Sequence, residues 1–155
     1  MSSFKGTYRF SVDSKGRVNI PSKLRKSLSD EIKDYFVVTR GFDKCVYVFP
    51  LDEWAKTEEA LQKLSDYNSD DRLFSRLMYE NATDVQLDSQ ARIVIPVELR
   101  QHASIEGEIL IIGNRNKIEL WNPKVYEDYK TKQTESYESV AEKVMNTGNT
   151  HDNSA

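Results

Sequence analysis

Two short segments of the chain place an aspartate four residues before an arginine. Asp13 and Arg17 belong to the first segment, and Asp88 and Arg92 belong to the second. Matched carboxylates from two halves of a protein could share a proton in a catalytic dyad. Alternatively, each arginine could make a bidentate contact to a guanine base edge in DNA. The neighbouring residues decide between these two chemistries.

The residues beside the aspartates argue against a catalytic dyad. An aspartic protease loop has the form Asp-Thr-Gly or Asp-Ser-Gly, whereas Lys15 and Gln90 occupy the glycine position here. The lysine would also lower the pKa of the neighbouring carboxylate, which opposes proton sharing. We therefore expect no catalytic residues, no enzyme activity, no metal site and no cofactor.

The two segments belong to an internal repeat. The pattern D-S-x-x-R-x-x-I-P-x-x-L-R spans residues 13–25 and again residues 88–100, without a gap. The later residues 37–50 align in the same way with residues 109–122. Self-similarity of this kind indicates a duplicated structural unit. Each half is predicted to run strand, turn, strand, short helix, strand, glycine turn, strand and helix.

The two halves differ in charge although they share the pattern. The whole chain has a formal net charge of −3, but residues 5–26 carry seven basic residues against one acidic residue, Asp13. The matching residues 80–101 carry two basic residues against four acidic ones. The first half is therefore the better candidate for contact with a polyanion.

The first segment predicts a β-hairpin whose turn is shaped by Asp13 and Gly16, because aspartate accepts backbone hydrogen bonds in turns and glycine tolerates positive φ. Asp88 has the same loop-shaping role in the second segment. The hairpin would present Lys15 and Arg17 at its tip. An alternative is that each aspartate and arginine form a salt bridge that only shapes the turn.

The remaining basic residues suit contacts to DNA phosphates. A short helix after Pro21 would bury Leu24 and Leu28 and turn its basic side chains toward solvent. Arg17 is expected to contact bases, and Arg92 is a second candidate in acidic surroundings. The expected phosphate contacts are Lys5, Arg9, Lys23 and Arg25, with Lys15 as a further DNA-binding residue.

A wider set of motifs resembles a known family. The motifs are Phe4-x-Gly6-x-Tyr8, Asp13-x-Lys15-Gly16-Arg17-x-x-Ile20-Pro21, Cys45-x-x-Val48-Phe49-Pro50 with Trp54, and Lys117-x-Glu119-Leu120-Trp121. Together they resemble MraZ, a family of bacterial transcriptional regulators built from two AbrB-like (SpoVT-AbrB) halves. The resemblance covers roughly residues 4–129.

The resemblance implies an α+β fold, a duplicated swapped-hairpin β-barrel with peripheral helices. It also implies ring-shaped homo-oligomers that bind short direct repeats in double-stranded DNA, upstream of the division and cell-wall gene cluster that includes the protein's own gene. The Asp-x-x-x-Arg loops would face the DNA. One departure concerns Ala91, which replaces the loop glycine: a turn with positive φ would be strained there by roughly 1 kcal/mol, or it would adopt another geometry.

The expected organisation has five parts. They are a first AbrB-like half at 4–50, connecting helices at 51–80, a second AbrB-like half at 81–122, a C-terminal helix at 123–145 and a disordered tail at 146–155. With 38% hydrophobic residues the chain can bury a core. It has no apolar run that could span a membrane, and its first residues do not resemble a signal peptide, so we expect a cytoplasmic protein. The family resemblance implies that the protein is associated with the nucleoid. The lone Cys45 lies in an apolar pattern and is expected to be buried.

These expectations combine into one function and one alternative. The sequence favours a DNA-binding transcriptional regulator, acting as a repressor through basic hairpin tips displayed around a homo-oligomeric ring. The alternative is an antitoxin-like or scaffolding module that binds protein, with the acidic half as its contact surface.

Overall fold

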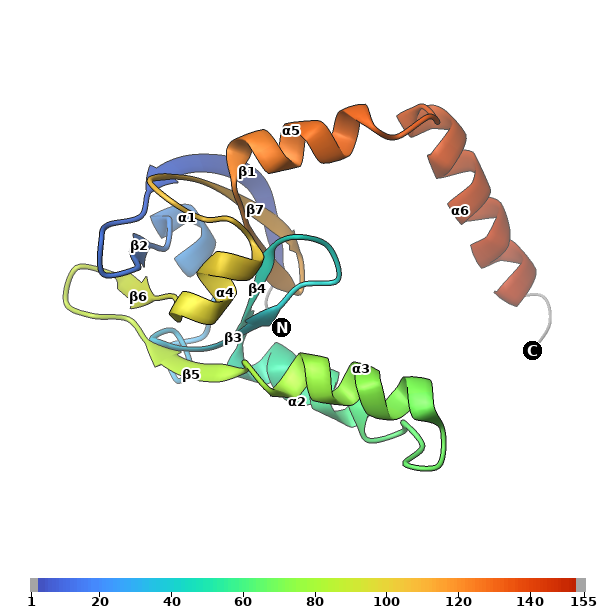
Figure 1. Ribbon diagram of the computed structural model, residues 1–155, viewed down its shortest axis with the longest axis horizontal. Helices are drawn as coiled ribbons and strands as arrows, with labels where there is room; N and C mark the ends of the chain where they lie inside the picture. Colours follow the sequence, from blue (N-terminus) through green and yellow to red (C-terminus); the bar gives the residue numbers. More distant parts are fainter. Residues whose placement is uncertain (1–2, 153–155) are drawn as a thin grey trace. The chain divides into compact units, whose positions relative to one another are not determined.

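The computed structural model describes residues 3–152 and has an α+β architecture (Figure 1). Its strands are β1 (Phe4–Ser11), β2 (Arg17–Asn19), β3 (Tyr35–Arg40), β4 (Val46–Pro50), β5 (Thr83–Gln86), β6 (Arg92–Val94), β7 (Glu108–Arg115) and β8 (Lys117–Trp121). Its helices are α1 (Ser22–Arg25), α2 (Leu51–Leu61), α3 (Ser69–Tyr79), α4 (Val97–His102), α5 (Pro123–Thr131) and α6 (Tyr137–Asp152).

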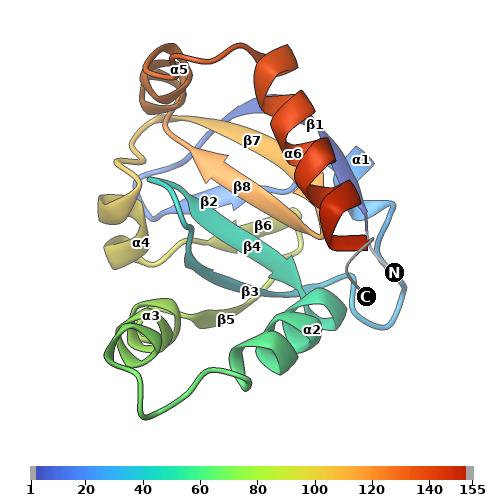
Figure 2. The ribbon, with the colours of Figure 1, turned by 90° about the vertical axis from the view of Figure 1, so that its right-hand side faces the viewer.

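The strands form two antiparallel sheets. The larger sheet has the order β1-β7-β8-β4-β3-β5, and β2 pairs with β6 in a separate two-stranded ribbon. Figure 2 shows the central strands of the larger sheet side by side, with α2 and α3 next to β3, β4 and β5. The two longest strands, β1 and β7, pair along their whole length, from Phe4 opposite Arg115 to Ser11 opposite Glu108.

The sequence repeat appears in the structure as an approximate twofold relation between the halves. The corresponding strands are β1 and β5, β2 and β6, β3 and β7, and β4 and β8. Exchanging each strand for its counterpart reproduces the order of the larger sheet in reverse. The first strand of each half therefore pairs with the third strand of the other half, as β1 does with β7 and β5 does with β3.

The prediction that β1 and β2 form a hairpin around the Asp13–Arg17 turn is wrong, because the halves exchange strands. The strands on either side of the Asp13–Arg17 turn do not pair with each other, because β1 pairs with β7 and β2 pairs with β6, both in the second half. No closed barrel is found among residues 3–152: β1 and β5 are the edges of the larger sheet. Residues 12–16 and 87–91 lead from those edges to the ribbon as loops, so no ladder joins the two sheets there.

The core lies between the ribbon, the short helices and the larger sheet. Val18 and Ile93, which face each other across the ribbon, are fully buried. Leu24 of α1 and Leu99 of α4 are also buried. Each such side chain contributes roughly 1.5–3 kcal/mol when it is removed from water. This burial anchors the ribbon that follows each loop in the core.

The two connecting helices form where the sequence predicts them. Trp54 of α2 and Met78 of α3 are buried. Asn68 caps α3, because Asn68 Oδ1 accepts the backbone N–H groups of Asp70 (2.9 Å) and Asp71 (3.0 Å). These bonds satisfy two of the N–H groups that a helix start leaves free.

The C-terminal region differs from expectation. The chain divides into two compact units after Val125, and the single helix expected at 123–145 is two helices, α5 and α6. A serine side chain explains the interruption: Ser136 Oγ accepts the backbone N–H of Ser139 at 3.1 Å and caps a new helix. Helix α6 continues to Asp152, into the segment expected to be disordered. The rest of that segment, residues 153–155, lies outside the described residues.

Candidate nucleic-acid interface

The first loop is closed by one aspartate. Asp13 Oδ1 accepts the backbone N–H groups of Lys15 (3.0 Å) and Arg17 (2.9 Å), while Oδ2 accepts Arg17 Nε at 2.5 Å. The backbone N–H of Gly16 donates to the Asp13 carbonyl oxygen at 3.0 Å. Gly16 has a φ of 82°, the left-handed region expected of it. The aspartate therefore fixes both the turn and the direction of the arginine.

The second loop has the same geometry. Asp88 Oδ1 accepts the N–H groups of Gln90 (2.8 Å) and Arg92 (2.9 Å), and Oδ2 accepts Arg92 Nε at 2.9 Å. Ala91 adopts a φ of 59°, so the loop keeps the turn and accepts the backbone strain. An L-residue in this region costs roughly 1–2 kcal/mol. Of the two outcomes considered for Ala91, the structure shows the strained turn.

Hydrogen bonding keeps both aspartates ionised. The pKa of Asp13 lies below its ordinary value, chiefly because the carboxylate accepts the backbone N–H of Arg17. The pKa of Asp88 is lowered for the same reason, by the backbone N–H of Arg92. Hydrogen bonds and cations that favour the charged carboxylate have this effect. Each carboxylate is therefore committed to its own loop and arginine.

The ribbon brings both arginines to one face. Arg17 is opposite Val94, and Arg92 is opposite Asn19. Residues opposite each other in an antiparallel pair point to the same side, and positions two apart on a strand do so as well. The alternate residues of the ribbon are buried, so these four face outward.

The exposed face retains access to both arginines. Their side chains are 32% exposed for Arg17 and 24% exposed for Arg92. Both side chains bond to an aspartate through Nε. The outer edge of each guanidinium, formed by Nη1 and Nη2, remains available for a ligand. Asn19 Nδ2 donates to the Gln90 carbonyl at 2.8 Å and ties this face to the second loop.

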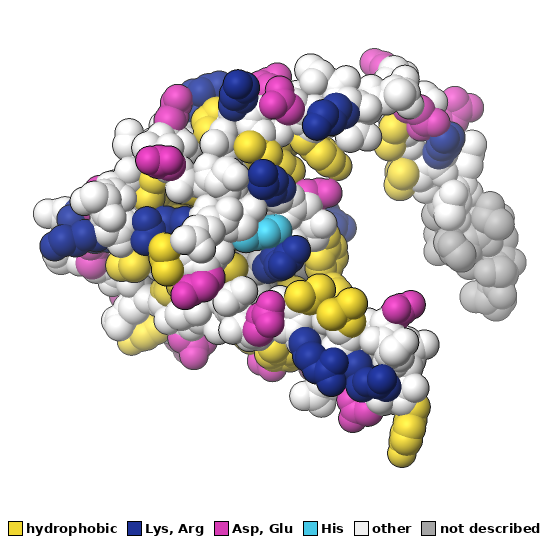
Figure 3. All heavy atoms as spheres, in the orientation of Figure 1, with side chains coloured by type: hydrophobic (Ala, Val, Ile, Leu, Met, Phe, Trp, Pro, Cys, Tyr) yellow, Lys and Arg dark blue, Asp and Glu magenta, His cyan; other side chains and the backbone are white. Residues whose placement is uncertain are grey.

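The basic residues near the first loop differ in their exposure to solvent. Lys15 at the loop tip and Lys23 on α1 are exposed, as expected. Arg25 was expected to point into solvent but is half-buried, because its Nε donates to the Ile20 carbonyl at 3.0 Å. In the space-filling view, Lys and Arg side chains lie where the two loops project, at the left of Figure 3.

The two basic residues of β1 lie along a strand that leads away from the loops. Arg9 forms an exposed ion pair with Glu108, with 2.9 Å between Nη1 and Oε1. Lys5 is near the start of β1, and Ser11 ends the strand beside the first loop. At about 3.3 Å per residue, the six steps between Lys5 and Ser11 span roughly 20 Å. The structure thus separates Lys5 from Arg17 and leaves its expected DNA contact as a prediction.

Arg100, which no sequence motif marked as functional, lies against the first loop. Arg100 Nε donates to the Ile95 carbonyl at 3.0 Å. A Cβ atom added to Gly16 would lie 2.7 Å from Arg100 Nε, so the guanidinium packs directly against the loop. The repeat contained the signal, because the final arginine of the shared pattern is Arg25 in the first half and Arg100 in the second.

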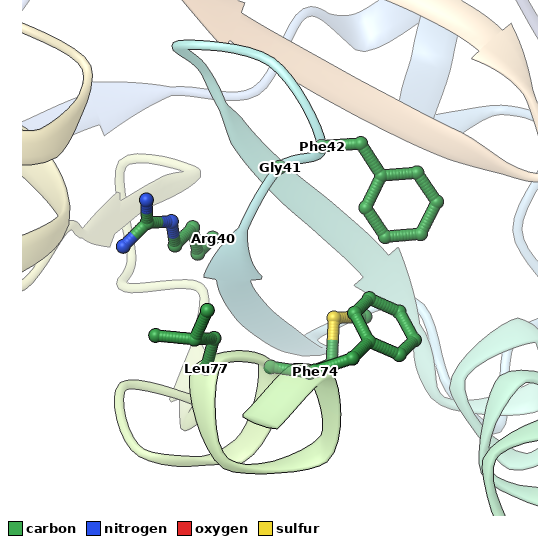
Figure 4. Close-up of a pocket in the computed structure, with 6 residues that line it drawn as sticks. Arg40, Gly41, Phe42, Phe74 and Leu77 are labelled. Atoms are coloured by element: carbon green, nitrogen blue, oxygen red, sulfur yellow. The ribbon is translucent and has the colours of Figure 1, made fainter. Parts of the chain in front are cut away.

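A separate hollow lies between the β3–β4 turn and α3. It has a volume of about 340 Å³, and Figure 4 shows Phe42 and Phe74 on one side and Arg40 and Leu77 on the other. The Phe42 and Phe74 ring centroids are 5.6 Å apart. Phe42 is 68% exposed, which is unusual for a large aromatic side chain.

Among the described residues, no group of three or more histidine, cysteine or acidic residues is placed to hold a metal ion. None of the described helices is both long and apolar enough to cross a membrane. Cys45 is buried as predicted, and burial raises the pKa of its thiol well above the ordinary value.

The fold and the loops define a duplicated α+β protein in which each half carries one Asp-x-x-x-Arg loop and the halves exchange strands. The family described as "MraZ protein, putative antitoxin-like" matches this chain twice, over residues 3–77 and 78–147. The chain belongs to the MraZ family, as its motifs predicted.

Similar proteins span nearly the whole chain and carry the name "Transcriptional regulator MraZ". The protein of Natranaerobius thermophilus is 40% identical over 142 residues, which cover 92% of this chain and 96% of the relative. That of Halothermothrix orenii is 43% identical over 138 residues, covering 89% and 94%. That of Pediococcus pentosaceus is 39% identical over 145 residues, covering 94% and 99%.

Proposed function

We propose that this protein is a sequence-specific DNA-binding transcriptional regulator. The observation that carries the proposal is the pair of matched loops, which place Arg17 and Arg92 on one outward face of the β2–β6 ribbon. The names of its relatives as transcriptional regulators support the same conclusion. The proposed chemistry is recognition of DNA in the cytoplasm, at the nucleoid, without a reaction or a cofactor.

The loop geometry supports direct reading of bases. In each loop the aspartate accepts a hydrogen bond from Nε, which leaves the Nη1–Nη2 edge of the arginine for a base contact. A bidentate arginine contact to guanine O6 and N7 is the commonest specific contact in the major groove. Because the aspartate already fixes the side chain, less rotamer entropy is lost on binding. We assign base contacts to Arg17 and Arg92, with Asp13, Gly16 and Asp88 shaping the loops.

We assign phosphate contacts to four basic residues, two near this face and two along β1. Lys15 and Lys23 are exposed near the first loop. Arg9 and Lys5 lie farther along β1, where Arg9 also forms an ion pair with Glu108. Such contacts position a protein on the duplex but do not read its sequence. Arg25 supports the second loop through Ile20. Arg25 Nε donates to the Ile20 carbonyl, and the Ile20 N–H donates to the Ala91 carbonyl at 3.0 Å.

We further propose that the protein binds direct repeats as a ring-shaped homo-oligomer and represses the division and cell-wall gene cluster that includes its own gene. The family resemblance supports this finer proposal. Exposed aromatic surface, including Phe42 and Phe74, also supports self-association. The exchange of β1 and β5 between the halves supports the swapped, AbrB-like arrangement.

Footprinting on the DNA upstream of the protein's own gene tests this function. The native protein should protect short repeated sites at moderate salt, and the Arg17→Ala/Arg92→Ala double variant should protect none at the same concentration. An exposed arginine on α3, changed in Arg76→Ala, is the matched control and should leave the footprint intact. Equal protection by the double variant would overturn the proposed interface. Retention of a protein partner without any footprint would favour the antitoxin-like or scaffolding alternative.

A further inference from the structure

The first loop rests on the second half of the chain. The backbone N–H of Ile95 donates to the Gly16 carbonyl at 2.8 Å. The Ile95 carbonyl in turn accepts Arg100 Nε at 3.0 Å. Ile95 is fully buried, and Arg100 is on α4, whose Leu99 is also fully buried. The position of the loop is therefore set by a chain of contacts from a well-packed helix.

The contact between Arg100 and the first loop leaves no room for a side chain at position 16. A Cβ atom at Gly16 would lie 2.7 Å from Arg100 Nε, 2.8 Å from the Ile95 carbonyl oxygen and 2.9 Å from Arg100 Cζ. Real Cβ atoms essentially never lie this close to other heavy atoms. The Arg100 guanidinium group thus packs against the Gly16 backbone. Gly16 is one residue from Arg17, so movement of the Arg100 guanidinium would redirect the Arg17 side chain.

We propose that Arg100 is a positioning residue for the first DNA-reading loop, supplied by the opposite half of the chain. This inference rests on the proposed DNA-binding function. Arg100 holds the Ile95 carbonyl with Nε and supports Gly16 with its guanidinium plane, and so keeps Arg17 aimed at the base edge. A lysine cannot replace it, because a flexible ammonium has neither the planar surface nor the fixed donor geometry.

The repeat provides an internal comparison. Arg25 of the first half donates Nε to the Ile20 carbonyl, and the Ile20 N–H donates to the Ala91 carbonyl, all at 3.0 Å. Each loop is therefore braced by an arginine from the other half. The counterpart of Gly16 in the second loop is Ala91, whose side chain is accommodated there. Arg25→Lys is thus the matched variant, acting on Arg92 and not on Arg17.

A double-mutant cycle tests the inference, with affinity measured on the footprinted DNA. Arg100→Lys keeps the positive charge, so the slope of log K against log salt should stay unchanged while affinity falls about tenfold, as for loss of one hydrogen bond to a charged group. In an Arg17→Ala background, Arg100→Lys should cause no further loss. In an Arg92→Ala background, Arg100→Lys should still cause the full tenfold loss. Arg25→Lys should cause a loss in the Arg17→Ala background but none in the Arg92→Ala background.

Two results would overturn the positioning role. Full affinity in Arg100→Lys would show that only the charge matters. An equal loss from Arg100→Lys with and without Arg17 would show that Arg100 acts independently of the loop. Circular dichroism and thermal unfolding of each variant check that the fold is intact, and Arg25→Lys tests the equivalent brace of the second loop if Arg100→Lys is unstable. Failure of the native protein to bind any upstream DNA would instead refute the proposed function itself.

Discussion

Arg17 and Arg92 lie on the same outward face of a two-stranded ribbon, although 75 positions separate them in the chain. Arg17 is opposite Val94, which is two positions from Arg92, so the two arginines are diagonal neighbours. Diagonal neighbours in an antiparallel pair are about 7–8 Å apart between Cα atoms. Two fixed arginines at this spacing suit one continuous DNA surface, so we expect the acidic second half to take part in the proposed interface.

Removal of either arginine should weaken specific binding by a similar amount. Arg17→Ala and Arg92→Ala should each cost about 1–3 kcal/mol per engaged subunit, because each removes one bidentate base contact. Preference for the contacted base should relax, while the oligomer stays assembled. Titration against operators with single base substitutions, with light scattering for assembly, measures both effects. An Arg92→Ala protein with native affinity would restrict base reading to the first loop.

Phosphate contacts should show themselves in salt dependence. Lys23→Ala should reduce the magnitude of the slope of log K against log salt by about 0.9 and weaken all sequences alike. Lys5→Ala should do the same only on longer duplexes, since Lys5 is roughly 20 Å along β1 from the loop end of that strand. Trimming the DNA flanks should remove the Lys5 effect and preserve the Lys23 effect. A change in base preference from either variant would contradict a phosphate role.

Spacing between DNA repeats should control affinity if several subunits bind together. Contacts after the first are made at high effective concentration, which raises the overall affinity. Repeats about 10–10.5 base pairs apart present the same face to successive subunits. Insertion of about five base pairs, half a turn, should therefore reduce binding steeply. Insertion of a full turn is the control, and native affinity for a single repeat would exclude cooperation.

The two loops should respond oppositely to exchange of glycine and alanine. Ala91→Gly should raise the free energy of unfolding by about 1 kcal/mol, because it relieves the positive φ of an L-residue. Gly16→Ala should lower that free energy by more than this amount, since its Cβ would meet Arg100 Nε at 2.7 Å as well as adopt positive φ. Chemical denaturation of both variants measures these changes. Equal tolerance at the two sites would contradict the tight packing at Gly16.

The hydrogen bonds that the two aspartates accept within their loops should be lost only at low pH. The pKa of Asp13 and of Asp88 is below the ordinary 3.8, so their contribution to loop order is complete above that value and is lost as the pH falls through the lowered pKa. Amide NMR shifts of Lys15 and Arg17 should therefore titrate with a midpoint below 3.8. Asp13→Asn should remove this transition. A midpoint at or above the ordinary value would show that the hydrogen bonds to the carboxylate are absent.

The sequence predicted the components of the site better than their connections. The Asp13 turn and the burial of Cys45 depend on nearby residues, and the structure confirms both predictions. The strand pairing depends on the other half of the chain, and local pattern alone cannot reveal which copy of a repeat provides the partner. The expected hairpin was wrong for that reason. Arg100 was missed likewise, because its contact with Gly16 joins residues from different halves.

Strand exchange between the halves also determines when the protein can fold during its synthesis. The first strand made, β1, pairs with β7, which begins at Glu108. At roughly 5–20 residues per second, β1 waits on the order of 5–20 seconds on the ribosome for its partner. Pairings between residues so distant in sequence also slow folding, because loop closure precedes the contacts that compensate for it. The nascent first half is thus the aggregation-prone stage, and a chain truncated before Glu108 leaves β1 without its partner strand.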